Sequence, residues 1–169
     1  MAFPDLPSDA PIHEKIAWAR ECFQQEGDRL LGDRDTGDLL ARLQAALEAS
    51  HRAMIEAGIA DECRVCDRRE GGSCCGAGLE DKYSGTLLLI NLLLGREIPS
   101  RRSDPSSCHF LGKEGCLLLA RHVICVNYLC RKITNRIDPE KISLLRQAEG
   151  EELALLFRLN ERIKKMLRE

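Results

Sequence analysis

Cysteine is the residue type in this sequence that offers the most chemistry. Nine of the 169 residues are cysteines, and eight of these fall into two groups in the middle of the chain. The eight are Cys63, Cys66, Cys74 and Cys75, then Cys108, Cys116, Cys125 and Cys130. Thiolates are soft ligands that bind zinc, iron and iron–sulfur clusters. The sequence therefore predicts that all eight are metal ligands.

The spacing of the cysteines bears on which metal they hold. Cys63 and Cys66 have two residues between them, which lets a tight turn bring two thiolates to one ion or cluster. Structural zinc sites usually show two such pairs, and this chain has only this one. In an extended chain the side chains of Cys74 and Cys75 would point apart. The two thiols would then bind at two separate sites or at two corners of a larger cluster. The irregular spacing favours an iron–sulfur cluster, with zinc as the alternative, and leaves open whether one or two centres form.

Cationic and imidazole side chains accompany the thiols. The cationic neighbours in sequence are Arg64, Arg68, Arg69, Arg121, Arg131 and Lys132. They either compensate the charge of an anionic thiolate centre or are solvated loop charges. His109 and His122 are expected to orient loops or donate to a cluster sulfur rather than replace a thiol. Cys22 lies among apolar residues of a predicted helix and is expected to be a core residue.

The N-terminal sequence and the charge indicate where the chain works. Its first 20 residues contain prolines and acids where an export signal needs a basic start and an apolar run. The longest apolar stretch, at 86–94, is too short to cross a bilayer. We therefore expect a cytoplasmic protein with reduced thiols rather than disulfides, and without a membrane partner. The net charge of −2 and the 4% of aromatic residues argue against nucleic acid as a partner, and a protein partner is left open.

Hydrophobic periodicity predicts several helices and one hairpin. The helices are expected at 12–26, 36–58, 80–95 and 139–168, with another within 120–136. The first helix is expected to be broken by Gly27, Gly32 and Gly37. Thr36 is expected to cap the second helix, and Asp138 with Pro139 to open the last. Residues 61–78 are rich in glycine and cysteine and are expected to form an irregular loop. The glycines at the ends of 112–115 predict the turn of a short hairpin.

Together these patterns predict a mostly α fold: a single helical domain with cysteine-rich loops and a small β-hairpin around a metal centre. Residues 1–11 are expected to form an N-terminal tail and 12–169 the domain. Within the domain, 12–60 is helical, 61–131 is the cysteine-rich metal-binding core and 139–168 is the C-terminal helix. An apolar seam on that last helix is expected to pack on the domain or on a second copy: Leu156, Leu159, Ile163 and Met166.

The combination of cysteine segments resembles a known family. The segments are Cys63-x₂-Cys66, the Cys74-Cys75 pair, Cys108-His109-Phe110-Leu111, Cys116, and Arg121 leading to Cys125 and Cys130. This pattern resembles the CxxCxxCC proteins, described as zinc- or iron-chelating domains, which include the flagellin lysine N-methylases. The resemblance covers residues 63–130 and implies that the chain binds zinc or iron.

Three functions follow from these observations. The first is a cysteine-cluster metal-binding protein, with an iron–sulfur cluster or zinc in a structural or redox role. The second, implied by the resemblance, is an S-adenosylmethionine-dependent enzyme similar to the protein lysine N-methylases. The third is zinc or iron handling through exchangeable thiols. The sequence has no glycine-rich cofactor fingerprint, P-loop or HExxH motif, so whether the chain is an enzyme stays open and no catalytic residue is predicted.

Overall fold

The computed structural model describes residues 3–4, 6–69 and 74–169, with the backbone alone at 67–69. In this part the chain is mostly helical and carries a single two-stranded sheet, as predicted. The elements in chain order are α1 (Ile12–Gly32), α2 (Arg34–Glu56), α3 (Ile59–Arg69), the 3₁₀ turn η1 (Leu79–Lys82), α4 (Gly85–Leu93), β1 (Leu111–Gly112), β2 (Gly115–Cys116), α5 (Val123–Asn127), α6 (Arg131–Arg136) and α7 (Pro139–Arg168). Within the described part of the chain, no helix combines the length and apolar character that crossing a bilayer requires.

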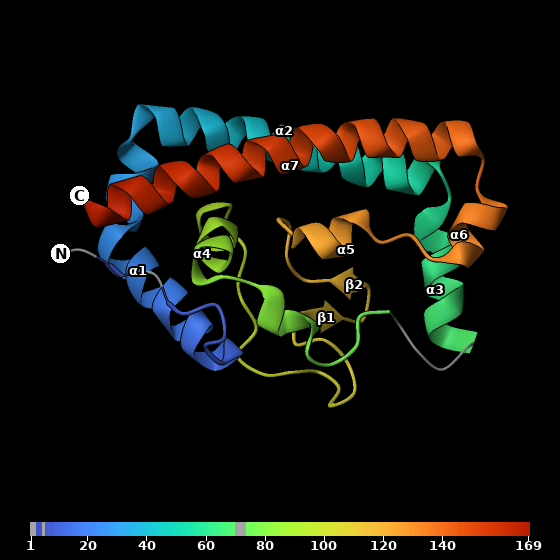
Figure 1. Cartoon of the computed structure of the whole chain (residues 1–169), viewed down its shortest axis with the longest axis horizontal. Helices are drawn as coiled ribbons and strands as arrows, with labels where there is room; N and C mark the ends of the chain where they lie inside the picture. Colours follow the sequence, from blue (N-terminus) through green and yellow to red (C-terminus); the bar gives the residue numbers. More distant parts are fainter. Residues whose placement is uncertain (1–2, 5, 70–73) are drawn as a thin grey trace.

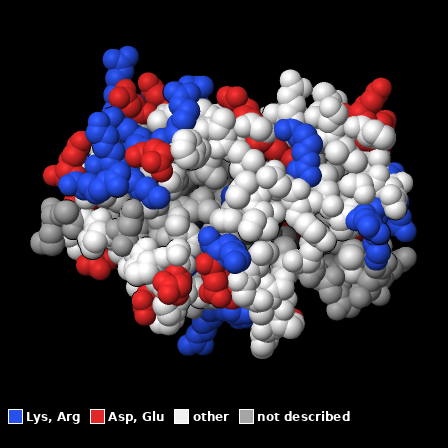
Figure 2. Space-filling model, viewed as in Figure 1, with Lys and Arg blue, Asp and Glu red and all other residues white. Residues whose placement is uncertain are grey.

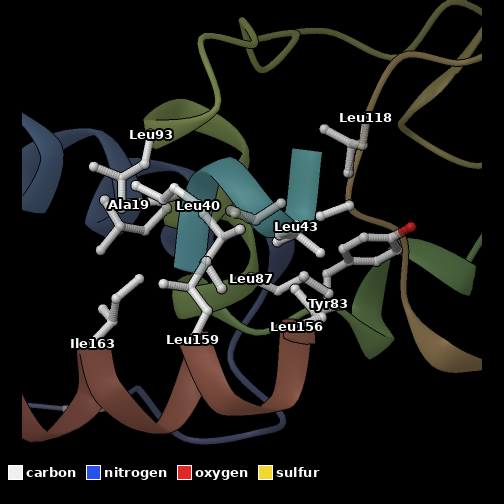
Figure 3. Close-up of a cluster of buried hydrophobic side chains, with 14 of the residues drawn as sticks. Ala19, Leu40, Leu43, Tyr83, Leu87, Leu93, Leu118, Leu156, Leu159 and Ile163 are labelled. Atoms are coloured by element: carbon white, nitrogen blue, oxygen red, sulfur yellow. The ribbon is translucent and has the colours of Figure 1, made fainter. Parts of the chain in front are cut away.

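Helices α2 and α7 run antiparallel along one side of the molecule (Figure 1). Apolar residues at intervals of three or four share one helix face, and that face of α7 is buried against the rest of the chain. Leu40 and Leu43 of α2 belong to the same core cluster (Figure 3). The predicted seam is part of this cluster: Leu156, Leu159, Ile163 and Met166. The seam therefore packs on this domain, which was one of its two predicted partners.

Helix α4 packs on α1 and is buried on almost every side, because nearly all of its residues are apolar. The hydroxyl of Ser84 caps it by accepting a hydrogen bond from the Leu87 N–H at 3.1 Å. A Cβ at Gly85 would lie 2.5 Å from a carbon of the Trp18 indole, so the close approach of the two helices needs glycine here. The helix predicted at 80–95 thus begins later than expected, after the η1 turn.

The first two helices differ from the prediction where they meet. Helix α1 continues through Gly27, which lies against the Phe23 ring, and ends at Gly32. Asp33, rather than Thr36, caps α2: its carboxylate accepts from the Thr36 N–H at 2.9 Å and from the Thr36 hydroxyl at 2.7 Å. Thr36 therefore lies in the first turn of α2, where its N–H and its hydroxyl donate to the capping carboxylate of Asp33.

The start of the predicted loop at 61–78 is helical, which corrects the sequence prediction. Cys63 and Cys66 lie on α3 and not in a tight turn. Residues at i and i+3 share a helix face, so the two thiols still project to one side. The glycines that suggested a loop begin only at Gly71, beyond the end of α3, and 70–73 lie outside the described residues.

Helices α3 and α6 lie together at one end of the molecule, with α5 and the hairpin between that end and α4 (Figure 1). Gly58, with a φ of 80°, allows the sharp turn from α2 into α3. A small apolar cluster joins this end: Ala57, Ile59, Ile133 and Leu145. Arg136 of α6 donates a 2.8 Å hydrogen bond to the Glu62 carboxylate of α3. The single helix predicted within 120–136 is thus two short helices, α5 and α6.

Candidate functional site: a cluster of eight thiols

Four cysteines gather where the hairpin meets the segment after α3. We call Cys75, Cys108, Cys116 and Cys125 the hairpin set. The Cys108 N–H donates a 2.7 Å hydrogen bond to the Cys75 carbonyl, and the neighbouring Gly76 and Ser107 form an antiparallel bridge. Cys116 lies on β2, and Cys125 lies on α5. Backbone pairing therefore brings thiols that are far apart in the sequence to one place.

The thiols of the hairpin set are close enough to affect one another's ionisation. Burial, with smaller contributions from the Glu80, Cys116 and Cys75 charges, raises the pKa of Cys108 to about 11. The Cys116 residue is exposed as a whole, but crowding around its thiol raises its pKa, and the thiols of Cys75 and Cys125 add to the shift. All of these effects favour the protonated thiol in the absence of a cation.

Tyr83, a core residue, donates a hydrogen bond to the thiol of Cys125. Its ring is 1% exposed and packs edge-on against Phe110, with 4.9 Å between the centroids. Figure 3 shows the Tyr83 hydroxyl at the edge of the aliphatic cluster, pointing away from the leucines. The hydroxyl donates a 3.8 Å hydrogen bond to Cys125 Sγ. Desolvation raises the pKa of Cys125, and this hydrogen bond counteracts the shift by stabilising the thiolate.

The other four cysteines form a second set, between α3 and α6. We call Cys63, Cys66, Cys74 and Cys130 the helix set. Cys130 is the N-cap residue of α6, and its thiol makes no capping hydrogen bond. Partial desolvation, followed by the charges of Cys130, Cys66 and Cys75, raises the pKa of Cys63. The Cys130 thiol at the start of α6 is therefore close enough to affect the ionisation of Cys63 on α3.

The Cys74-Cys75 dipeptide joins the two sets. The expectation that these two side chains point apart is wrong, because a hydrogen bond between their thiols is the main reason that the pKa of Cys74 is raised. Cys63 is another thiol neighbour of Cys74. Cys75 packs against the large core, whereas Cys74 is exposed. The two thiols are therefore neighbours, and the dipeptide lies where the hairpin set meets the helix set.

None of the nine cysteines forms a disulfide, and the ninth, Cys22, lies apart from the cluster. Cys22 is fully buried on α1, where burial and the nearby Glu26 raise its pKa to about 12. This confirms that it is a core residue. In the described part of the chain, no group of three or more Cys, His, Asp or Glu side chains is arranged to hold a metal ion.

Both histidines near the cysteines are engaged with backbone groups. The Nε2 atom of His109 lies 2.9 Å from the Pro99 carbonyl, which fixes the connector before the hairpin. Nδ1 of His122 accepts a 3.2 Å hydrogen bond from the Ile124 N–H and so caps α5. Desolvation and the nearby Lys82 lower the pKa of His122. These contacts agree with the expectation that the two histidines orient loops.

Arg121 is a cation whose charge reaches several thiols of the cluster. Its charge acts on Cys63 of the helix set and on Cys116 and Cys125 of the hairpin set. It also acts on two carboxyls of α7 that are almost fully buried, Glu149 and Glu152. By contrast, the exposed Arg64 guanidinium lies 3.5 Å from the carboxylate of Asp61. Figure 2 shows few charged side chains over α5 and the hairpin on the face in view.

Sequence reasoning missed two polar residues that position the cluster. The Glu80 carboxylate is 2% exposed and accepts hydrogen bonds from Arg102 and from the Gly78 N–H, which secures the chain beside Cys108. The Asn91 amide is fully buried and holds the chain that follows the hairpin. An asparagine inside the otherwise apolar helix α4 is a sequence signal for such a role, since buried amides need partners. Glu80 carries no comparable signal.

No family model, curated protein or solved structure matches this chain. The chemistry of the site therefore rests on its own residues. Eight thiols outside any disulfide, with Arg121 near several of them, are suited to holding soft or borderline cations. The donor set fits zinc, iron and iron–sulfur clusters alike.

Proposed function

We propose that this protein binds a metal centre through the thiolates of the eight-cysteine cluster, in a structural or redox role. An iron–sulfur cluster is the favoured cofactor and zinc is the alternative. The observation that carries the proposal is that α3, the segment around Cys75, the hairpin, α5 and the N-terminus of α6 bring eight thiols, none of them in a disulfide, into one region of the fold. Apolar packing alone gives no reason for eight thiols to share one place, three of them exposed.

The electrostatics of the cluster favour the binding of a cation. Neighbouring thiols and desolvation raise the pKa of Cys63, Cys108, Cys116 and Cys125. A bound cation reverses this effect: each ligating thiol releases its proton to solvent, and the thiolate is stabilised by the metal. The segments around Cys75 and Cys108 have little regular structure, so bound metal would also rigidify them.

The resemblance to the CxxCxxCC proteins points to the same chemistry, because its matching segments contain all eight thiols. It also introduces the methylase-like activity as an alternative. Metal binding depends on the thiols alone, whereas methyl transfer would need a binding site for S-adenosylmethionine as well. We therefore propose metal binding as the function and do not propose methyl transfer.

The decisive experiment is elemental analysis and a visible spectrum of protein purified without oxygen. An iron–sulfur protein will be brown, with absorption near roughly 400 nm and matching amounts of iron and acid-labile sulfide. A zinc protein will be colourless and contain zinc in stoichiometric amounts. Folded protein without zinc, iron or another transition metal, and without metal uptake on reconstitution under reducing conditions, would overturn the proposal.

Metal handling is the second candidate, and one observation favours it. Cys63, Cys74 and Cys116 are exposed, so a competing ligand could reach the site from solvent. Exchange kinetics distinguish the roles: a handling protein will lose its metal rapidly to a mild chelator, and a structural site will retain it.

A further inference from the structure

We infer that Arg146 of α7 is a positioning residue for the thiol cluster, because it fixes the short helix α5 and, with it, the Cys125 thiol. The contacts that carry this inference are hydrogen bonds between α7 and α5, and they do not depend on what the cluster binds. The importance of Arg146 for function rests on the proposed metal binding, in which Cys125 is one of the ligands.

Helix α5 cannot hold its own place by local structure or by apolar packing. It has only five residues, far fewer than an isolated helix needs to be stable in water. Val126 is its one buried residue, at 2% exposed, whereas Val123 and Ile124 are 44% and 47% exposed. His122 caps the N-terminus of the helix, but the last carbonyls of a helix have no partner within it. The C-terminal end of α5 therefore needs partners from elsewhere in the chain.

Arg146 supplies these partners from α7, which lies beside α5 (Figure 1). Its Nη1 donates a 3.3 Å hydrogen bond to the Val126 carbonyl, and its Nη2 donates one of 2.7 Å to the Asn127 carbonyl. Arginine side chains often bind the last carbonyls of a helix, but here the arginine belongs to a different helix. The two hydrogen bonds thus fasten the end of α5 to α7.

The guanidinium of Arg146 is itself held by its own helix. Glu149, one turn further along α7, accepts a 2.8 Å hydrogen bond from Nη1, and the Glu149 side chain is only 3% exposed. A hydrogen bond between two charged groups is among the stronger ones, and the planar guanidinium can bind a carboxylate and two carbonyls at once. The orientation of Arg146 is therefore set by α7, and α5 docks against it.

Cys125 lies in the middle of α5, between the capped N-terminus and the two fastened carbonyls. Its Sγ accepts the 3.8 Å hydrogen bond from the Tyr83 hydroxyl on the side of the core. This contact is long, and hydrogen bonds weaken steeply with poorer geometry, so it depends on the backbone of α5 staying in place. Arg146 thus acts on the thiol through the backbone and does not touch Sγ.

The test measures how often α5 leaves its place, as the alkylation rate of Cys125 by iodoacetamide in the metal-free, fully reduced protein at one fixed pH. Arg146→Met keeps the aliphatic stem but removes the donors. It should raise this rate about tenfold, because losing two hydrogen bonds favours local opening of α5. Trypsin cleavage after Arg121 and Arg131 gives one peptide with Cys125 and Cys130, which tandem mass spectrometry distinguishes.

Three comparisons separate positioning from a general loss of structure. Arg158→Met, at an exposed arginine of the same helix, should leave the Cys125 rate unchanged. Arg146→Lys should lie between the parent and Arg146→Met, because an ammonium retains the charge beside Glu149 but lacks the planar fork. Competition with a chelator should show metal affinity about tenfold lower for Arg146→Met than for Arg158→Met.

An Arg146→Met protein that alkylates at Cys125 no faster than the parent would overturn the inference. An equal increase at the fully buried Cys22 would also overturn it, since that would report unfolding of the whole chain. Failure of the parent protein to take up zinc or iron would overturn the proposed function instead. The alkylation rates would still decide whether Arg146 fixes α5, so the two failures are distinguishable.

Discussion

The backbone N–H of Cys108 donates a 2.7 Å hydrogen bond to the carbonyl oxygen of Cys75. The contact joins two cysteines that the sequence separates by the whole of α4 and the connector that follows it. Because only backbone atoms take part, a serine at either position retains the hydrogen bond while removing the thiol. Substitutions there can therefore separate metal binding from the local fold.

Cys75→Ser should lose metal and stability together. We expect less bound metal and a Tm lower by about 5–10 °C, since a ligand at about 100 times its Kd stabilises by about 2.7 kcal/mol. Metal analysis and thermal unfolding measure the two effects, and in the metal-free proteins the Tm difference should nearly vanish. Cys22→Ser is the control, because it perturbs the core without removing a ligand. A Cys75→Ser protein with full metal content and the parent Tm would show that Cys75 is not a ligand.

Tyr83→Phe should weaken metal binding at the hairpin set while keeping the fold. The substitution removes the hydroxyl that donates to Cys125 Sγ but retains the ring against Phe110. Loss of such an outer hydrogen bond typically costs about tenfold or more in metal affinity, and about 1 kcal/mol in stability. Competition titration with a chelator measures the affinity. Tyr128→Phe, at an exposed tyrosine, is the matched control, and equal affinities for the two variants would rule out this role for Tyr83.

Asn91→Leu should destabilise the protein despite its similar shape. The Asn91 side chain donates to the Leu87 and Ala120 carbonyls and accepts from the Leu119 and Ala120 N–H groups, at 2.9–3.0 Å. Leucine would leave buried backbone groups unpaired, at about 1–3 kcal/mol for each that finds no water. Urea unfolding should therefore show a loss of at least about 2 kcal/mol.

The exposed Asn135 provides the comparison for this experiment. Asn135→Leu should change the free energy of unfolding by no more than about 0.5 kcal/mol. If Asn91→Leu behaves like Asn135→Leu, the amide does not secure the chain after the hairpin.

The ion pair between Asp33 and Arg162 should make stability depend on pH in acid. Hydrogen bonds from the Arg162 guanidinium, at 2.7 and 2.9 Å, and from Thr36 lower the pKa of Asp33 from 3.8 to about 2. Between these values the unfolded chain binds more protons than the folded chain. The contribution is therefore fully present above pH 3.8 and is lost as the pH falls towards about 2.

Asp33→Asn tests this pH dependence, since asparagine can still cap α2 but does not titrate. Urea unfolding at several pH values should show a smaller decrease in stability on acidification for Asp33→Asn than for the parent protein. Asp38→Asn, at an exposed carboxylate in the first turns of α2, should follow the parent curve. Parallel curves for Asp33→Asn and the parent would contradict the assignment.

Local patterns in the sequence were sufficient for most of the helices. The 3.6-residue period of the apolar side chains placed α2 and α7, and Asp138 with Pro139 marked the start of α7. The two glycines around Lys113 and Glu114 marked the hairpin. These features depend on backbone geometry and on the burial of one face, both of which are encoded within a few neighbouring residues.

Helix boundaries were less predictable where tertiary contacts decide them. Gly27 does not end α1: it is buried against the rest of the chain, and the helix continues to Gly32. The helix α3 was missed because most of its residues are polar and it precedes a glycine-rich stretch. Packing of Ile59 against the small cluster at that end, together with the Arg136–Glu62 contact, supplies what local propensity lacks.

The sequence by itself determined that eight cysteines are available, because residue type and spacing can be read directly from it. Only the tertiary structure decided which thiols are neighbours, since the pairing of Cys75 with Cys108 and of α3 with α6 joins segments distant in the chain. It likewise decided that Tyr83, Asn91 and Glu80 position the cluster. Such contacts arise from packing between separate elements, which no local pattern specifies.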